Sequence, residues 1–451
     1  MANSMVRLAL AVSFIVALTA CSRNQTNGSK EADGFSANDG VSTPSAFKEP
    51  NPKPIELVFY GAGFSEEPFM LDYGNAIKEK FPHITVKFIR VDTAKLSEVI
   101  ASGAQLDIQL SVDFQLKQNM IDFGLQYDHA ELIHKYKYDT GKLNIQMMET
   151  LRSIGGGKLY GLPIYLTIPS LLYNKDLFDK FGVGYPKDGM TWDEAYELAK
   201  KMTRNEGGIS YRGMVVAFQA LSVHNQLSLN FVDTESGKAL FSSNGNWQKH
   251  VNNLTRFYKI PGNEVDDKTI QGAAQNNFFF KDKAAAMFAT VAGASVFSLN
   301  PSVNMDVATI PFYPDLQGVS GRPSAGVFGV SALSKQKDEA FQVIAFLASK
   351  EFQLKRSKLG AISVLSNDEE IRKAFGAEDA AWKGKNIQAM NPSRFAAPGR
   401  ASNYDHLALP NILGQMNLVA QGSVDVNTAL RTAGELTEKA IEDMKSRLNN
   451  K

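Results

Sequence analysis

The segment Gly155-Gly156-Gly157-Lys158 carries residue types that could bind a phosphate group. A phosphate-binding P-loop also needs a glycine where Arg152 stands, and a Ser or Thr hydroxyl for Mg²⁺ where Leu159 stands. Without them the segment lacks both the backbone geometry and the metal-binding oxygen. The sequence therefore predicts a glycine-rich turn before a strand here, and no nucleotide site.

The other residues that could do chemistry also lack the spacing that the chemistry requires. The sequence contains no G-x-S-x-G nucleophile elbow, no G-x-G-x-x-G fingerprint and no H-E-x-x-H zinc motif. His129 and His134 lack the i, i+4 spacing of a shared metal site, and Asp266-Asp267 lacks the alternating oxygens of a calcium loop. The 47 acidic residues offer many carboxylate pairs, but nothing marks two as a glycosidase pair. We therefore expect no metal, no cofactor and no catalytic residue.

Cys21 is the only cysteine of the chain, and it follows a segment typical of secreted proteins. Arg7 supplies a positive charge, and Leu8 to Leu18 form an apolar run that is too short to span a bilayer. The run L-T-A-C that ends at Cys21 resembles the lipobox of bacterial lipoproteins, in which the cysteine is acylated, for example with palmitate. We predict a signal peptide over residues 1–20 and lipidation of Cys21. The alternative is a simple signal peptide followed by a free thiol.

Composition separates a tether from a globular body. Residues 21–54 are rich in Ser, Asn, Gly, Thr, Pro and Lys, which predicts a flexible tether.

The length of 451 residues favours two domains. The 48 basic and 47 acidic residues leave a net charge of +1 without a basic cluster, so nucleic acid is not an expected partner. No later stretch has 18 consecutive apolar residues, so the expected membrane anchor is lipid alone.

After the tether, short strands alternate with helices. Apolar, β-rich runs predict three strands, at Ile55–Tyr60, Ile84–Val91 and Leu106–Val112. Helical spacing of apolar residues predicts one helix from Pro68 to Phe81 and another from Thr93 to Ser102. This strand–helix order predicts an α/β fold with a parallel sheet covered by helices on both faces.

Three further helices are predicted downstream. Thr191-Trp192-Asp193-Glu194 has the pattern of a capping box, with an apolar helix face behind it. Apolar residues also recur at helical spacing over 339–352 and 427–448. A strand is predicted over 213–217.

Several segments, in the same order, resemble one protein family. They are Gly157 to Pro163 with its continuation Leu172 to Phe178, the helix start at Thr191, the run Phe279 to Met287, and Gly326 to Ser334 followed by Lys335 to Leu347. The set resembles the extracellular solute-binding proteins of ABC importers, a large sugar-binding family that includes maltose-binding protein. The chain departs from the family pattern at Asp282, where glycine is usual.

The resemblance implies a two-lobed periplasmic-binding-protein-like fold, each lobe a mainly parallel sheet flanked by helices. Lobe 1 would comprise residues 54–165 and 327–365, and lobe 2 residues 166–326 and 366–451, joined by a hinge. It also implies a monomeric, lipid-anchored receptor on the extracytoplasmic face of the cell membrane. This receptor would capture a carbohydrate, such as an oligosaccharide, and deliver it to the permease of an ABC importer. The alternatives are a membrane-anchored hydrolase or lyase acting on a glycan, and an accessory receptor without transport.

Candidate ligand residues of lobe 1 follow from the chemistry of sugars, which combine apolar faces with hydroxyl rims. The loop after the first strand offers Phe64 and Glu66. Asp113 stands at the end of the third strand, where family members often place a ligand-binding acid; a helix N-cap is an equal alternative. Tyr165 falls on the family's crossing between lobes, and Thr167 is a weaker candidate on the same strand.

In lobe 2, the pairs Phe218-Gln219 and His224-Asn225 follow the predicted strand. We expect one residue of each pair to bind and favour Gln219 and Asn225; packing or capping is the alternative role of all four. Many family members stack a tryptophan on the sugar just after the segment that ends here at Met287. This chain has none there, so Phe297 is the nearest substitute, and Trp382 is the one tryptophan that we expect in the cleft. Arg394, with Arg400, could pair with the carboxylate of a uronate-type ligand; an ordinary surface loop is the alternative.

Overall fold

The computed structural model describes residues 53–61, 65–293, 295–366, 368–392 and 394–449. The signal peptide, Cys21, nearly all of the tether and Phe64 lie outside these ranges. The predictions made for them are therefore not addressed by the fold.

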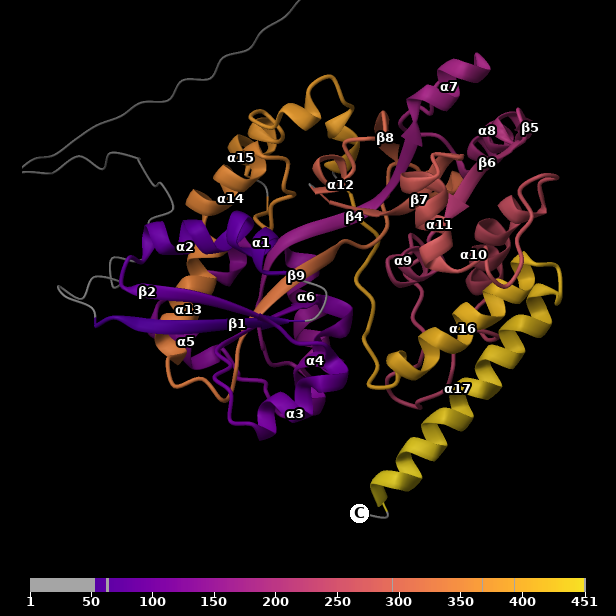
Figure 1. The fold of residues 1–451 in the computed structure, drawn as a ribbon. Helices are drawn as coiled ribbons and strands as arrows, with labels where there is room; N and C mark the ends of the chain where they lie inside the picture. The colour runs from indigo at the N-terminus through magenta and orange to yellow at the C-terminus, as the bar shows by residue number, and fades with distance from the viewer. Residues whose placement is uncertain (1–52, 62–64, 294, 367, 393, 450–451) are drawn as a thin grey trace, which may run out of the picture. The chain divides into compact units, whose positions relative to one another are not determined.

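Within the described residues, nine strands form one hydrogen-bonded series in the order β2-β1-β3-β9-β4-β7-β6-β5, with β8 paired to β4 (Figure 1). Their bounds are β1 Ile55–Gly61, β2 Ile84–Arg90, β3 Ile108–Val112, β4 Leu162–Asn174, β5 Arg204–Glu206, β6 Ile209–Val216, β7 Ala285–Ala292, β8 Met305–Thr309 and β9 Ser324–Val330. The three predicted strands at the N-terminal end are confirmed as β1, β2 and β3. β1 pairs in parallel with β2 and with β3, and β6 pairs in parallel with β7.

The long strand β4 is shared between two sets of strands. Its residues 162–167 pair antiparallel with β9, whereas residues 168–173 pair antiparallel with β7 and residues 170–174 with β8. A register irregularity lies between Pro163 and Tyr165, where proline cannot donate a ladder hydrogen bond. Thr167 and Ile168 therefore mark the point where the chain passes from one set of strands to the other.

The helices surround these strands. Their bounds are α1 Glu66–Phe69, α2 Asn75–Lys80, α3 Leu96–Ala101, α4 Leu116–Asn119, α5 Ala130–Lys135, α6 Ile145–Ile154, α7 Lys175–Phe181, α8 Trp192–Met202, α9 Phe218–Val223, α10 Gly245–Thr255, α11 Gly272–Asn276, α12 Ser295–Leu299, α13 Lys337–Leu347, α14 Lys350–Lys358, α15 Glu369–Ala374, α16 Asp405–Ala420 and α17 Val426–Asn449. A π-helical turn, Met70–Gly74, joins α1 to α2, so the predicted first helix is one helical stretch. In Figure 1 α16 and α17 form a packed pair at the C-terminal end.

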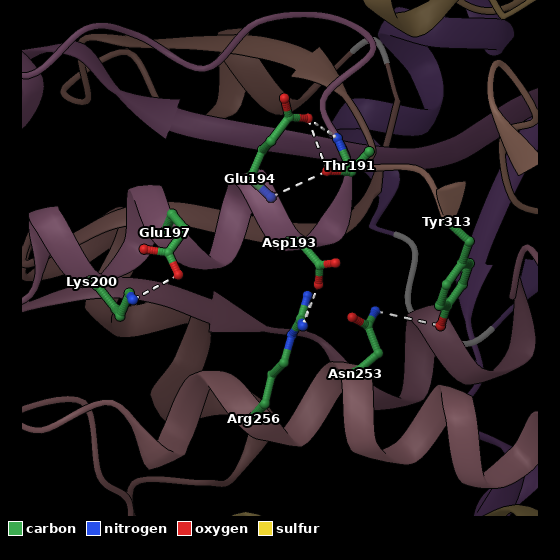
Figure 2. Close-up of polar contacts among 8 residues, drawn as sticks. All are labelled: Thr191, Asp193, Glu194, Glu197, Lys200, Asn253, Arg256 and Tyr313. Carbon is green, nitrogen blue, oxygen red and sulfur yellow. Dashed lines mark hydrogen bonds and ion pairs between the residues drawn. The ribbon is translucent and has the colours of Figure 1, made fainter. Parts of the chain in front are cut away.

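Two local signals at helix starts can be checked directly. The capping box is confirmed: the Thr191 hydroxyl accepts from the Glu194 amide at 3.2 Å, and the Glu194 carboxylate accepts from the Thr191 amide at 2.7 Å (Figure 2). The single helix predicted over 339–352 is wrong, because α13 ends at Leu347 and α14 begins at Lys350. Ser349 lies between them in an extended conformation, and its side chain caps α14 by accepting from the Phe352 amide.

Two hydrophobic clusters form the interior. One gathers residues of β1, β2, β3, β9 and α13 and extends to Phe375 and Trp382. The other gathers residues of α8, α10, α16 and α17 around β6. Trp192 and Trp247 are buried in this second cluster, as the helix-face pattern predicts. The α/β class is confirmed, and the first cluster continues past β4 into residues of β6, β7 and β8.

Candidate functional site

A cavity of about 500 Å³ lies where several strands begin or end. We call it the neutral cleft. Its wall contains Val112 at the end of β3, Thr167 in β4, Val216 at the end of β6 and Ser324 at the start of β9. The remaining lining residues are Phe114, Ala217, Phe218, Gln219, Ala220, Val223, His224, Ile270, Gln271, Gly272, Asn276, Thr290, Val291, Leu413 and Asn417.

The neutral cleft is polar but uncharged. No Asp, Glu, Lys or Arg is among its described lining residues. Burial lowers the pKa of His224 to about 3, so its imidazole is neutral at physiological pH and can both donate and accept. Hydroxyls and amides, together with one exposed aromatic ring, are groups that recognise an uncharged hydroxylated molecule.

Phe114 and Gln219 offer the cleft an exposed aromatic ring and an exposed amide. The Phe114 side chain is 40% exposed although it is a large apolar residue. Its ring meets the edge of His224, with ring centroids 5.9 Å apart and planes at 70°. Gln219 stands exposed in the first turn of α9 and makes no hydrogen bond to any described residue. An aromatic face and a free amide thus flank the same space.

A second, smaller cavity adjoins the neutral cleft. We call it the inner cavity; its volume is about 150 Å³. Phe114, Val223 and His224 line both cavities, so these residues form the boundary between them. The other lining residues are Asp113, Lys117, Gln118, Asp122, Thr150, Ile154, Leu229, Asn230, Phe231, Arg322, Pro323, Gly399, Arg400, Ala401, Ser402, Asn403, Asp405, His406 and Leu409.

Unlike the neutral cleft, the inner cavity is lined by carboxyl groups and a guanidinium group. Asp113 accepts hydrogen bonds from the Ser324 hydroxyl at 2.6 Å and from the Ala325 amide at 3.3 Å, while burial raises its pKa to about 6. Burial also raises the pKa of Asp405 to about 7 and lowers the pKa of Arg322 to about 10. Desolvation dominates all three shifts, because charge is disfavoured in this enclosed space.

The structure brings two predicted site residues to these cavities. Asp113 lies on the inner cavity, and Gln219 lies on the neutral cleft together with the weaker candidate Thr167. Asp113 also begins a short 3₁₀ turn, but its side chain does not cap that turn. The sequence analysis did not propose Phe114, the next residue, as a ligand-binding residue. Its position just after the end of β3 is the one sequence feature that could have indicated such a role.

Tyr165 and Asn225 occupy structural positions next to the cavities. The Tyr165 ring lies on Gly326 of β9, so closely that a Cβ on Gly326 would be 1.9 Å from its Cε1. Burial raises the pKa of Tyr165 to about 12. Asn225 is 2% exposed, and its amide bonds the Ser222 carbonyl and both backbone groups of Leu229. Neither residue lines either cavity.

Phe297 and Trp382 come together, but inside the protein. Their ring centroids are 4.6 Å apart, and Phe375 packs on the other side of Trp382 at 5.6 Å. Trp382 is 2% exposed and Phe297 4%, so neither ring faces the two cavities. Together they form a buried aromatic cluster, which is a packing role.

The remaining predicted residues lie on the surface. Glu66 is the exposed first residue of α1. The Arg394 side chain is exposed, and its carbonyl accepts from the Ser320 amide at 2.9 Å. Arg400, in contrast, reaches the inner cavity, where its backbone amide donates to Asn230 at 3.0 Å.

A third hollow, of about 660 Å³ beside α8, has the carboxylates that a glycan-cleaving site would need. Figure 2 shows that each is engaged: Asp193 pairs with Arg256 at 2.6 Å, Glu194 closes the capping box, and Glu197 pairs with Lys200 at 2.6 Å. These carboxylates take part in surface ion pairs and in a helix cap. None of the three is free to act as a catalytic acid or base.

The described residues lack two kinds of feature. They contain no group of three or more His, Cys, Asp or Glu side chains arranged to hold a metal ion. None of their helices combines the length and the apolar character needed to cross a bilayer.

Known proteins share both sequence and fold with this chain. It is 26% identical over 306 residues to a binding protein of Brucella abortus, covering 64% of this chain and 70% of that protein. It is 25% identical over 385 residues to the galactooligosaccharide-binding protein of Bacillus subtilis, covering 81% and 85%. Among solved structures, the ABC substrate-binding protein of Listeria monocytogenes in complex with cycloalternan superposes with a TM-score of 0.67 at 19% identity, over 86% of this chain and 99% of that one.

These likenesses confirm the two-lobed periplasmic-binding-protein-like fold that the sequence motifs imply. A family model described as bacterial extracellular solute-binding protein matches residues 63–354. The chain therefore belongs to the family of bacterial extracellular solute-binding proteins.

Proposed function

We propose that this protein is a lipid-anchored receptor that captures an uncharged carbohydrate outside the cell and delivers it to an ABC importer. The observation that carries the proposal is the neutral cleft: a cavity of about 500 Å³ at strand ends, lined by hydroxyls, amides and apolar groups without a charged side chain among its described residues. An acidic or basic ligand would find no counter-charge there, whereas a hydroxylated neutral one would find donors, acceptors and an aromatic face.

The relatives support a carbohydrate, and specifically an oligosaccharide. The Bacillus relative is named for binding galactooligosaccharides, and the Listeria structure contains cycloalternan. We infer that Thr167, Gln219 and Phe114 contact the ligand in the neutral cleft. The Gln219 amide and the Phe114 ring are exposed, so they can contact a ligand without first breaking hydrogen bonds within the protein.

Capture would proceed by closure of two lobes about β4. We propose lobe 1 as residues 54–165 and 327–365 and lobe 2 as 166–326 and 366–451, with the hinge where β4 changes partners near Thr167. Trp382 packs on Phe297, and the Asn386 amide donates to Asp306, both partners being in lobe 2, which supports keeping this segment in lobe 2. Ligand bound between the lobes would stabilise the closed form because it contacts both.

A thermal-shift screen tests the ligand class. The purified protein would be heated with glucose, maltose, maltotetraose, galactose, galactobiose and glucuronate. A bound ligand raises the melting temperature in proportion to the logarithm of its concentration above the dissociation constant. We expect neutral sugars to shift the transition and glucuronate to leave it unchanged. A shift by glucuronate alone, or by no sugar at all, contradicts the proposal.

We also propose that the protein only binds its ligand and does not cleave it. The supporting observation is that Asp193, Glu194 and Glu197 are each engaged by a partner. Incubation with maltotetraose or galactobiose should yield no shorter sugar by chromatography. Accumulation of a shorter sugar would favour the hydrolase alternative.

A further inference from the structure

Residues 394–403, which lead into α16, lie between the two proposed lobes. We call this segment the strap. Its residues 399–403 line the inner cavity together with Thr150 and Ile154 of α6, in lobe 1, and Val223 of α9, in lobe 2. Figure 1 shows the segment running into α16 between α6 and α9. The strap thus borders both lobes at once and is placed to connect them.

The first part of the strap is attached to lobe 2 by its backbone. The Ser320 amide donates to the Arg394 carbonyl at 2.9 Å, and the Ala396 amide donates to the Ser320 carbonyl at 2.8 Å. These bonds are those of a parallel bridge between Ser320 and Phe395. The Phe395 ring is half-buried against the first hydrophobic cluster, which contains residues of both lobes. The position of the strap along lobe 2 is therefore fixed at its start.

A glycine lets the middle of the strap lie directly on lobe 2. A Cβ on Gly399 would be 1.7 Å from Arg322 Nη1 and 2.9 Å from Asn230 Oδ1, so a side chain would push the strap away. The Arg400 amide donates to the same Asn230 oxygen at 3.0 Å. Arg322 is itself held, because its Nη2 donates to the Leu229 carbonyl at 2.8 Å. The middle of the strap is thus also fixed to lobe 2.

Among the described residues, one hydrogen bond joins the strap to lobe 1. The Ala401 amide donates to the Ser153 hydroxyl, near the C-terminal end of α6, at 3.2 Å. Ser153 is exposed and uncharged, so water can replace either partner when the bond breaks. The attachment to lobe 1 is therefore the weaker of the two, and a movement between the lobes would break it first.

The bond between Ala401 and Ser153 is present in an arrangement in which the lobes also touch elsewhere. The Phe114 ring of lobe 1 meets the His224 ring of lobe 2, with centroids 5.9 Å apart. Phe114, His224 and Ala401 all line the inner cavity. The bond thus accompanies contact between the lobes. Opening about β4 would separate its two atoms, because one is fixed to each lobe.

We propose that the strap is a latch: it moves with lobe 2, its Ala401 amide engages Ser153 of lobe 1 when the lobes close, and it releases Ser153 when they open. This inference rests on the proposed function, in which the lobes close around a ligand. Neither residue lines the neutral cleft, so neither contacts a ligand there. The latch stabilises the closed form itself, and it should change the affinity for every ligand by the same factor.

Removal of the Ser153 hydroxyl tests the latch. All proteins carry Cys21→Ala in the full chain, which removes the proposed lipid and keeps the samples free of detergent. Ser153→Ala should lower the ratio of closed to open protein by about 3- to 10-fold, the effect of one neutral hydrogen bond. If the ligand-free protein is mostly open, the loss weakens affinity; if it is mostly closed, the loss raises the radius of gyration. Calorimetric titration with maltotetraose and with galactobiose measures the affinity, and small-angle X-ray scattering measures the radius of the ligand-free protein.

Two matched variants separate the latch from a general effect of substitution. Ser102→Ala removes another exposed hydroxyl of lobe 1, which donates to the Val99 carbonyl at the end of α3, and should behave as the wild type. Ser153→Thr keeps the acceptor oxygen and should restore both wild-type values. Since alanine favours a helix more than serine does, Ser153→Ala should not lower the melting temperature. A loss of affinity would then not reflect unfolding.

Gly399→Ala tests the attachment to lobe 2. Its Cβ would displace the strap from Arg322 and so draw the Ala401 amide away from Ser153. The variant should change affinity or radius in the same direction as Ser153→Ala does. Combined with Ser153→Ala, it should add less than its own separate effect, because both act through one hydrogen bond.

The outcomes separate the latch from the function. If Ser153→Ala matches the wild type in both affinity and radius, or if Ser102→Ala changes them equally, the latch is overturned and the carbohydrate receptor stands. If neither sugar binds but Ser153→Ala has the larger radius, the carbohydrate function is overturned and the latch stands. If neither sugar binds and the radii are equal, both proposals are overturned.

Discussion

Asp113 is a carboxyl group whose ionisation works against the folded state. Burial raises its pKa to about 6 from an ordinary value of 3.8. A raised carboxyl pKa means that the folded protein holds the proton more tightly than the unfolded chain does. The contribution of Asp113 to stability is therefore most favourable below about pH 4, declines as the pH rises from about 4 to about 6, and stays low above that range.

Asp113→Asn should therefore change the pH dependence of unfolding. Asparagine cannot ionise, and its Oδ1 can still accept from Ser324 and Ala325. Relative to the wild type, the variant should gain up to about 3 kcal/mol of unfolding free energy between pH 4 and pH 7.5. Urea unfolding of both proteins at pH 4, 5.5 and 7.5 measures this difference. A difference that is the same at all three values would show that Asp113 does not titrate in this range.

Gln219 is the residue at which the neutral cleft can be tested with little risk to the fold. Its side chain is exposed and forms no hydrogen bond to a described residue, so Gln219→Ala should leave the melting temperature unchanged. Losing one neutral hydrogen bond should weaken sugar affinity by about 3- to 10-fold in titration calorimetry. Gln388→Ala, at an exposed position outside both cavities, is the matched control and should bind as the wild type does. Equal affinities of the two variants would place the ligand elsewhere.

At the scale of elements, the antiparallel pairing of β4 with β9 depends on a glycine. Tyr165 lies on Gly326, where no side chain would fit without moving the ring. Gly326→Ala should destabilise the protein by about 1–3 kcal/mol, a typical effect of overpacking, as measured by urea unfolding. Gly326→Ala combined with Tyr165→Ala should lose less than the sum of the two single variants, because the clash is gone.

Gly414→Ala, within the helix α16, should have the opposite effect on the free energy of unfolding. Gly414 lies in α16 with no atom within 4 Å of an added Cβ, so alanine should stabilise the protein by about 0.5–1 kcal/mol through its better helix propensity. If Gly326→Ala also proved neutral or stabilising, the close packing of Tyr165 on Gly326 would not constrain the pairing of β4 with β9.

Local patterns predicted the elements well where the signal lay within the element itself. The apolar runs at β1, β2 and β3 and the capping box at Thr191 are such signals, and they were confirmed. The break between α13 and α14 was missed because the apolar spacing continues through Ala348 and Ser349. The helix cap of Ser349 is decided by its backbone conformation, which the spacing does not reveal.

At the scale of the whole molecule, the inner cavity shows why the site was only partly predictable. Asp113 and Phe114 follow β3, His224 follows α9, Arg322 precedes β9, and Asp405 begins α16. Only the tertiary fold brings these four segments together. The family model ends at residue 354, so its motifs carry no information on the segment from Gly399 to Leu409 that closes the cavity.

The missing stacking tryptophan has a related explanation. Sequence reasoning placed Trp382 in the cleft by elimination among three tryptophans. Its ring instead fills the space between Phe297 and Phe375 and lies against Gly360, where a Cβ would be 2.2 Å from its Nε1. Among the described residues that line the neutral cleft, Phe114 is the exposed aromatic ring, and its place beside His224 depends on the arrangement of β3 and α9.

The proposed anchorage concerns the whole molecule, and it would depend on one atom, the sulfur of Cys21. Because the chain has no other cysteine, Cys21→Ala removes the proposed acylation without affecting any other thiol. In bacteria expressing the full chain, the wild type should incorporate labelled palmitate and sediment with membranes, since multiple acyl chains give stable anchoring. Cys21→Ala should incorporate no label and leave the membrane fraction, either released or as an uncleaved precursor. Ser22→Ala, one residue further on, should behave as the wild type. Label retained by Cys21→Ala, or a wild type that takes up none, would leave a simple signal peptide as the better interpretation.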